Sequence, residues 1–164
     1  METVRLITAT DAEAWTGLYR LAYREAPHEF FDPPRSVEQA KDLLQKRSTY
    51  SRQYGVFLEQ HLVGMARAVD GDSRFARHRI TVCGVFVRKS FRGHGLSRLL
   101  LTDLFHKEAA RGKEMASIFV EVNNTPARDL YFSLGFIEAG RIEDAARWNG
   151  QRFDHLFLDK PLTP

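Results

Sequence analysis

The chain has 164 residues, of which 43% are hydrophobic and 12% aromatic, enough for one globular domain with its own core. Its 24 basic and 21 acidic side chains leave a net charge of only +3, which does not favour nucleic acid as the main ligand. The sequence contains no membrane-length apolar run and no secretory signal pattern, and the single Cys83 permits no internal disulfide. We therefore expect one domain over residues 1–164 that works in the cytoplasm, with neither a membrane nor a nucleic-acid partner.

The first third of the chain predicts one strand and two helices. Strand Val4–Ile7 precedes a capping box at Thr10–Glu13, where we expect the first helix to begin. A second capping box at Ser36–Gln39 begins a helix that runs to about Arg47. Residues 27–35 form a loop between the two helices, because consecutive prolines forbid helix there.

The middle of the chain predicts three strands and a leucine-rich helix. Residues 54–58 and 62–69 are expected to be strands joined by a short turn, and residues 80–87 form the next strand. The helix that follows ends near Gly112. Its core face is expected to consist of Leu96, Leu99, Leu100 and Leu104.

The last third predicts a strand, a helix and a hairpin. Residues 118–122 read as a buried strand, and residues 137–148 and 152–158 as a pair joined at Asn149-Gly150, a dipeptide typical of tight hairpins. The strand–helix–strand unit from 80 to 122 requires a parallel crossover. The chain therefore predicts a single α/β domain (of the α+β type) with a mixed sheet.

The turn after the third strand has the chemistry of a phosphate site. Gly93 and Gly95 lie directly before a helix, where backbone N–H groups lack partners and the helix dipole is positive. From Ser73 to Thr102 there is no acidic residue. The basic residues of this stretch are Arg74, Arg77, Arg79, Arg88, Lys89, Arg92 and Arg98.

Two common phosphate motifs do not match this turn. Arg98 stands where a dinucleotide fingerprint needs a third small residue, and the Gly-Lys-Ser/Thr ending of a nucleoside-triphosphate loop is absent. The pattern Arg92-x-x-Gly95-x-Ser97 instead resembles the acetyl-CoA loop of the GNAT superfamily of N-acetyltransferases, with Ser97 departing from the usual Gly or Ala.

A second motif strengthens the resemblance. The segment from Asn124 through Ala127, Leu130 and Tyr131 to Gly135-Phe136 is similar to the second half-site of the same superfamily, Asn-x-x-Ala-x-x-Leu-Tyr-x-x-x-Gly-Phe. The segment is also physically coherent, since Asn124 can cap a helix and Gly135 can end it.

The resemblance implies a fold and a set of cofactor contacts. It implies a mostly antiparallel sheet with helices on both faces and a central parallel strand pair that splays apart around the pantetheine arm. Backbone groups of Val85, Phe86 and Val87 would pair with the pantetheine, and Asn124 would bond the same arm. The pyrophosphate would lie on the loop formed by Arg92, Gly93, His94, Gly95, Leu96, Ser97 and Arg98.

The resemblance also implies direct acetyl transfer from acetyl-CoA to a primary amine in a ternary complex. Tyr131 is the candidate acid for the departing thiolate, although a core aromatic would also occupy that position. No carboxylate lies near Thr81, where many members carry the base, so Glu121 is the first choice, with a water chain or a solvent-facing Glu121 as alternatives. No metal is expected, because the six histidines show no ligand spacing.

The acetyl acceptor is the part of the implied reaction that the sequence determines least. A small-molecule amine or a peptide N-terminus would approach the loop that carries Glu29 and Asp32, together with Glu25, or the final hairpin. The hairpin candidates are Arg147, Trp148, Asp154 and His155, and its edge offers a surface for a homodimer. Two other functions stay open: an acyl-CoA-binding module of the same fold without transferase activity, and a basic nucleic-acid-binding protein.

Overall fold

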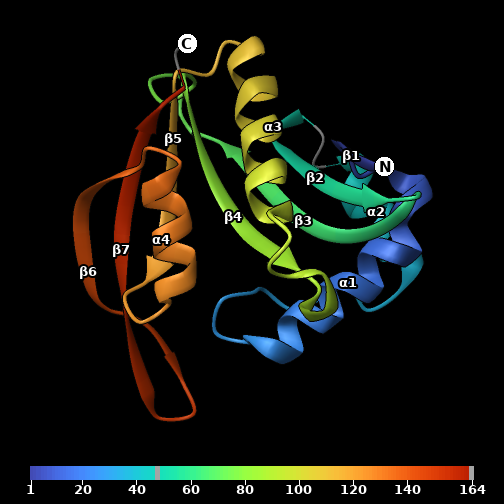
Figure 1. Ribbon diagram of the computed structural model, residues 1–164, viewed down its shortest axis with the longest axis horizontal. Coiled ribbons are helices and arrows are strands. Elements are labelled where there is room, and N and C mark those ends of the chain that lie inside the picture. Colours follow the sequence, from blue (N-terminus) through green and yellow to red (C-terminus); the bar gives the residue numbers. More distant parts are fainter. Residues whose placement is uncertain (47–48, 163–164) are drawn as a thin grey trace. The chain divides into compact units, whose positions relative to one another are not determined.

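The computed structural model describes residues 1–46 and 49–162. The elements follow the predicted order (Figure 1): β1 Glu2–Leu6, η1 Ala9–Asp11, α1 Ala12–Glu25, α2 Val37–Lys46, β2 Ser51–Leu58, β3 His61–Asp70, β4 Arg79–Val87, η3 Lys89–Phe91, α3 Leu96–Ala110, β5 Met115–Glu121, α4 Thr125–Ser133, β6 Ile137–Trp148 and β7 Gln151–Pro161. The expected helix end near Arg47 lies outside the described residues. No helix within the described ranges combines the length and the apolar character needed to cross a membrane.

The seven strands have the order β1-β2-β3-β4-β5-β7-β6 and are mostly antiparallel, as expected. The parallel pair is β4 and β5, whose register joins Arg79–Val82 to Met115–Ile118. This pairing confirms the predicted parallel crossover, while the splay beyond it stays a prediction. At the next positions Gly84 adopts φ +62°, so the regular strand conformation of β4 is interrupted there.

The chain divides into two compact units. The first comprises residues 1–69 and 84–104, and the second comprises residues 70–83 and 105–164. Two of the boundaries fall inside β4 and α3, so each of these elements contributes to both units.

The first unit is built on β2 and β3, whose residues are buried almost without interruption. Such runs, in place of polar–apolar alternation, indicate strands that are covered on both faces. On one face, α1 and α2 supply Trp15, Leu18, Ala22, Ala40 and Leu44 to a core shared with Phe57, Met65 and Phe86. In Figure 1, α1 and α2 accordingly lie beside these strands.

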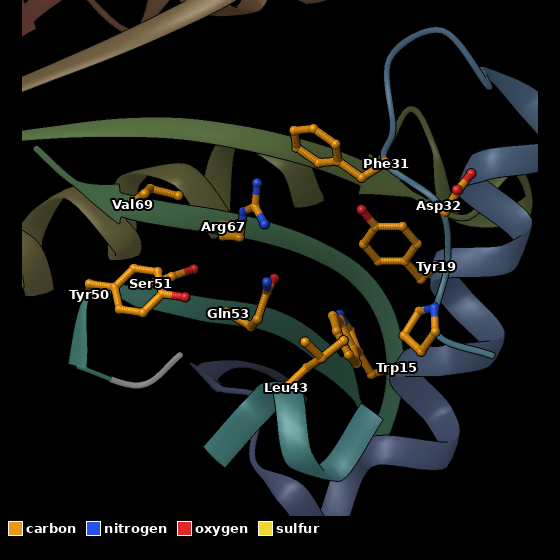
Figure 2. Close-up of a pocket in the computed structure, with 11 residues that line it drawn as sticks. Trp15, Tyr19, Phe31, Asp32, Leu43, Tyr50, Ser51, Gln53, Arg67 and Val69 are labelled. Carbon is orange, nitrogen blue, oxygen red and sulfur yellow. The ribbon is translucent and has the colours of Figure 1, made fainter. Parts of the chain in front are cut away.

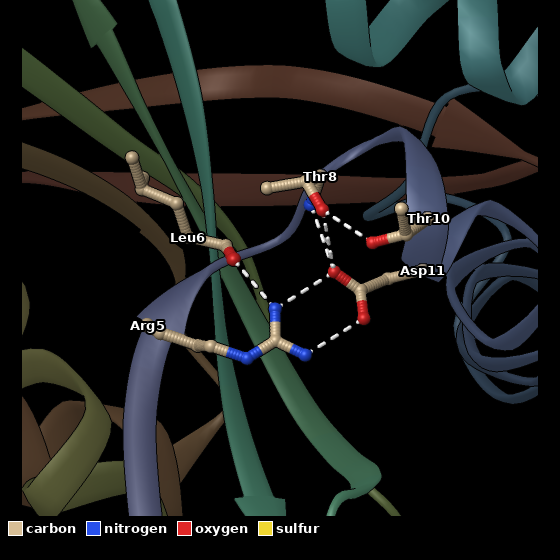
Figure 3. A network of polar contacts seen from close by, with 5 residues as sticks. All are labelled: Arg5, Leu6, Thr8, Thr10 and Asp11. Atoms are coloured by element: carbon tan, nitrogen blue, oxygen red, sulfur yellow. Dashed lines mark hydrogen bonds and ion pairs between the residues drawn. The ribbon is translucent and has the colours of Figure 1, made fainter.

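The first helical segment begins at Ala9, as the 3-10 helix η1, earlier than the predicted cap at Thr10, whereas α1 itself begins at Ala12. The capping box joins Thr8 and Asp11, with the Thr8 N–H donating to Asp11 at 2.9 Å, and not Thr10 and Glu13 (Figure 3). The prediction was wrong because the one-turn 3-10 helix η1 precedes α1 and takes the capping contacts. The cap at Ser36 is confirmed, since its hydroxyl accepts from Gln39 N–H at 3.1 Å.

Helix α3 also departs from the prediction at one position. Leu96, Leu100 and Leu104 are buried as expected, but Leu99 is 41% exposed and its place is taken by buried Leu101. The predicted hairpin between β6 and β7 is confirmed, and its turn residues Asn149 and Gly150 have φ values of 48° and 76°.

Candidate active site

A glycine turn connects η3 to α3 in the first unit. Gly93 and Gly95 adopt φ values of +82° and +74°, the left-handed region that favours glycine. The first bond of α3 runs from Leu99 N–H to Gly95 O at 3.0 Å. The amides of Leu96 and Ser97 therefore have no acceptor within the helix, and the positive end of its dipole lies at the turn. The site predicted from the sequence has the local geometry that holds phosphate.

The glycine turn also leaves open space around Gly93 and Gly95. A side-chain carbon placed on Gly93 or Gly95 would meet no protein atom within 4 Å. Glycine is thus required here by backbone conformation and not by packing, and a ligand can approach the main chain closely. The residues present therefore fit a diphosphate.

Arg92 is held beside this turn by three contacts. Its Nε donates to the carbonyl of Val87 at 2.9 Å, its Nη2 pairs with Glu25 Oε2 at 2.5 Å, and its guanidinium lies 5.3 Å from the centre of the Phe86 ring. Glu25 is the last residue of α1, so this ion pair ties the end of that helix to the glycine turn. His94 and Arg98 are exposed around the same turn.

The end of β4 combines core side chains with a predicted backbone role. Phe86 and Val87 are buried, and the Phe86 ring meets Phe30 edge-on at 6.1 Å, whereas Val85 is half-buried. The side chains of Phe86 and Val87 therefore serve the core. Their predicted contacts with the pantetheine use peptide groups, of which the Val87 carbonyl already accepts from Arg92 Nε at 2.9 Å.

The other predicted residues share the second unit. Asn124 caps α4, where its Oδ1 accepts from Ala127 N–H at 3.3 Å, and its own N–H donates to Glu121 O at 3.0 Å. Tyr131 is 6% exposed and meets the ring of Phe136 at 6.0 Å. The helix, its cap and the buried tyrosine match the pattern expected from the sequence.

Glu121 ends β5 opposite His155 of β7 and is half-buried. Thr81 is paired with Ser117 in the parallel register, so this point of β4 carries a hydroxyl and no carboxylate. The structure therefore leaves the choice of base as a prediction.

Several acceptor-side candidates have local partners. In the first unit Glu25 pairs with Arg92, and Glu29 lies 3.9 Å from His28. In the hairpin Arg147 pairs with Asp144, and Asp154 pairs with Arg141 at 2.6 Å. These hairpin pairs hold the pKa values of Asp144 and Asp154 below their usual range through hydrogen bonds from the two arginines.

A pocket that the sequence did not indicate lies in the first unit. It has a volume of about 550 Å³ and is bordered by α1, α2, the loop between them, β2 and β3 (Figure 2). Its lining comprises Trp15, Tyr19, Phe31, Asp32, Pro34, Leu43, Tyr50, Ser51, Gln53, Arg67 and Val69. Polar residues such as Ser51, Gln53 and Arg67 inside buried strands were the available signal, since such strands are normally apolar.

The fold and the glycine turn define an acetyltransferase of the GNAT type. The family model described as acetyltransferase (GNAT) family matches residues 15–136, and the chain belongs to this family, which uses acetyl-CoA. An L-methionine sulfoximine/L-methionine sulfone acetyltransferase from Salmonella typhimurium is 26% identical, with 99% of this chain and 98% of that protein covered.

Solved structures agree on the fold. A putative acetyltransferase from Salmonella typhimurium with its cofactor acetyl-CoA superimposes with a TM-score of 0.88 at 21% identity, covering 100% of this chain and 95% of the other. An N-acetyltransferase from Staphylococcus aureus Mu50 gives 0.88 at 16% identity, with 99% of both chains covered.

Proposed function

We propose that this acetyltransferase acts on nitrogen: it moves the acetyl group of acetyl-CoA to a primary amine by direct attack in a ternary complex. The observation that carries the proposal is the open turn with left-handed Gly93 and Gly95 at the start of α3. The related Salmonella protein is named for two small molecules, which supports a small-molecule amine as the first acceptor class to test, ahead of a peptide N-terminus.

The cofactor-binding roles follow from the main chain and three cationic side chains. Amides from Gly93 to Arg98 hold the pyrophosphate, with charge added by Arg92, His94 and Arg98. Peptide groups of Val85, Phe86 and Val87 pair with the pantetheine amides, and the amide side chain of Asn124 bonds the same arm. Bound acetyl-CoA supplies an activated thioester.

Proton transfers are assigned to two side chains. An alkyl ammonium has a pKa of about 10.4, so the acceptor must lose a proton before it can attack, and Glu121 takes that proton directly or through water. The Tyr131 hydroxyl gives a proton to the departing thiolate. Direct transfer requires no covalent enzyme intermediate.

The loop assignment is tested by Gly95→Glu, with Gly112→Glu as the matched control. Both glycines have positive φ, at +74° and +85°, and neither has a neighbour within 4 Å of an added side-chain carbon, so both changes cost about 1 kcal/mol of backbone strain. The glutamate at 95 stands where phosphate would bind. Calorimetry with coenzyme A should find binding abolished in Gly95→Glu and retained in Gly112→Glu; equal affinities would refute the assignment.

Catalysis is tested by following free thiol release from acetyl-CoA with a panel of amines, with products identified by mass spectrometry. Acetylated amines are the expected result. Tight acetyl-CoA binding without turnover on any small amine or peptide would identify an acyl-CoA-binding module instead.

A further inference from the structure

The pocket of the first unit contains buried polar atoms that lack partners. Within the described part of the chain, the Trp15 Nε1 and the Ser51 Oγ make no hydrogen bond, although each residue is only 3% exposed. An unpaired buried donor is costly, and folded proteins keep few of them unless a ligand or water completes the bond. Both residues line the same cavity of about 550 Å³, a size typical of small-molecule sites.

Opposite charges border the pocket. Arg67 projects from β3 with its guanidinium 5.3 Å from the centre of the Phe31 ring, and Asp32 lies next to that phenylalanine in the loop. Figure 2 shows Arg67 between Tyr50 and Ser51 on one side and Tyr19, Phe31 and Asp32 on the other. A guanidinium prefers a carboxylate, and a carboxylate prefers an ammonium group.

The rest of the lining is apolar or neutral. Leu43, Val69 and the ring of Phe31 offer hydrocarbon surface, while Gln53 adds an uncharged amide. These walls favour a ligand whose remaining part is uncharged.

Aromatic contacts connect the pocket to the strand assigned to the pantetheine. Tyr19 meets Phe30 at 5.9 Å, and Phe30 meets Phe86 of β4 at 6.1 Å, all within the first unit. Asp32 directly follows Phe30 and Phe31 in the loop. The side of the pocket that carries the Asp32 side chain is therefore the side near these rings.

We propose that this pocket binds the acetyl acceptor, and that the acceptor is an α-amino acid with an uncharged side chain. The carboxylate of the amino acid pairs with Arg67 and accepts hydrogen bonds from the Ser51 hydroxyl and the Trp15 Nε1–H. Its amino group faces Asp32. This inference rests on the proposed N-acetyltransferase activity only for the chemical step; occupancy of the pocket is a separate observable.

Binding is measured without turnover in the Trp148→Phe variant, where Trp15 becomes the remaining tryptophan of the chain. L-phenylalanine and L-methionine should change Trp15 fluorescence saturably, whereas the amines that lack only the carboxylate, phenethylamine and 3-(methylthio)propylamine, should bind at least tenfold more weakly. Equal effects of each amino acid and its amine would overturn the inference.

Steady-state kinetics then distinguish the proposed N-acetyltransferase reaction from the proposed role of the pocket as the acceptor site. Arg67→Met should raise KM for the amino acids tenfold or more and leave KM for acetyl-CoA unchanged. The control Arg24→Met removes an exposed arginine of α1 that does not line the pocket, and it should change neither the KM for the amino acids nor the KM for acetyl-CoA. Amino acids that perturb Trp15 but are never acetylated would refute the proposed reaction alone, while efficient acetylation of peptides or amines with no response at Trp15 would refute the pocket assignment alone. If Arg67→Met loses its circular dichroism spectrum, the comparison of each amino acid with its amine decides the matter.

Discussion

The hydroxyl of Tyr131 is the single atom on which the proposed acid chemistry depends. The ring is buried against Phe136, so Tyr131→Phe keeps the packing and removes only the proton donor. We expect kcat to fall roughly 100-fold, the lower end of what general acid catalysis contributes, with little change in affinity for acetyl-CoA. Tyr54→Phe, which removes the hydroxyl of a tyrosine that is 2% exposed in the first unit, is the control. Steady-state kinetics check this, and full activity would remove Tyr131 from catalysis.

The ion pair between Glu25 and Arg92 places a carboxylate next to the proposed phosphate site. Both side chains are partly exposed, at 33% and 46%, so the pair adds little to folding stability. Removing the negative charge with Glu25→Gln should tighten coenzyme A binding by roughly two- to tenfold at low salt, because a like charge no longer opposes the phosphates.

Salt dependence distinguishes this electrostatic effect from a structural one. The gain in Glu25→Gln should shrink between about 50 and 300 mM salt as the Debye length falls. Glu13→Gln, on an exposed position of α1 in its first turn, should bind coenzyme A like the wild type. Weaker binding by Glu25→Gln in calorimetry would instead mean that Glu25 orients Arg92 for the phosphates.

At the scale of elements, the start of the first helical segment depends on one carboxylate. Asp11 receives both guanidinium nitrogens of Arg5, at 2.7 and 2.8 Å, and the N–H of Thr8 (Figure 3). The hydrogen bonds from Arg5, then from Thr8, lower the pKa of Asp11 to about 2 from its ordinary 3.8. A carboxylate with a lowered pKa stabilises the fold above its unfolded value, and this stabilisation is lost as the pH falls from about 4 to about 2.

Asp11→Asn should therefore lower the free energy of unfolding by about 1 kcal/mol at pH 7. This value is reduced for solvent screening because Arg5 is 44% exposed. The difference from the wild type should disappear as the pH approaches 2. Urea unfolding across this range measures both quantities. Asp42→Asn breaks the exposed pair with Lys46 and should change stability by a few tenths of a kcal/mol at every pH. A constant difference for Asp11→Asn would contradict the assigned role of its charge.

Local signals in the sequence predicted elements well where one residue type determines the backbone. Asn149-Gly150 specified its turn, and Gly93 and Gly95 specified theirs, because positive φ values require such residues. The prediction failed at Thr10 because Thr8 and Asp11 make the capping contacts instead. It failed at Leu99 because the burial of a residue on α3 depends on which segments of the chain surround the helix.

At the scale of the whole molecule, sequence motifs found the turn and the cap of α4 but not the pocket. The pocket unites Trp15, the loop at Asp32 and Arg67, which are far apart in sequence and carry no common spacing. Only the tertiary packing of α1 and α2 on β2 and β3 brings them together. The glycine turn, in contrast, is contiguous along the chain, so its chemistry is visible in one segment.

The division into two units makes a prediction about cooperativity. Because β4 and α3 each continue across a boundary, unfolding one unit removes backbone hydrogen bonds from an element that also belongs to the other. We therefore expect a single unfolding transition for the whole chain.

The two tryptophans report on different units, since Trp15 belongs to the first and Trp148 to the second. In Trp148→Phe, urea midpoints from Trp15 fluorescence and from far-ultraviolet circular dichroism should coincide, and in Trp15→Phe the same should hold for Trp148. Comparing the two probes within each variant cancels any stability change caused by the substitution itself. Midpoints that differ between probes in either variant would show that the units unfold independently despite the shared strand and helix.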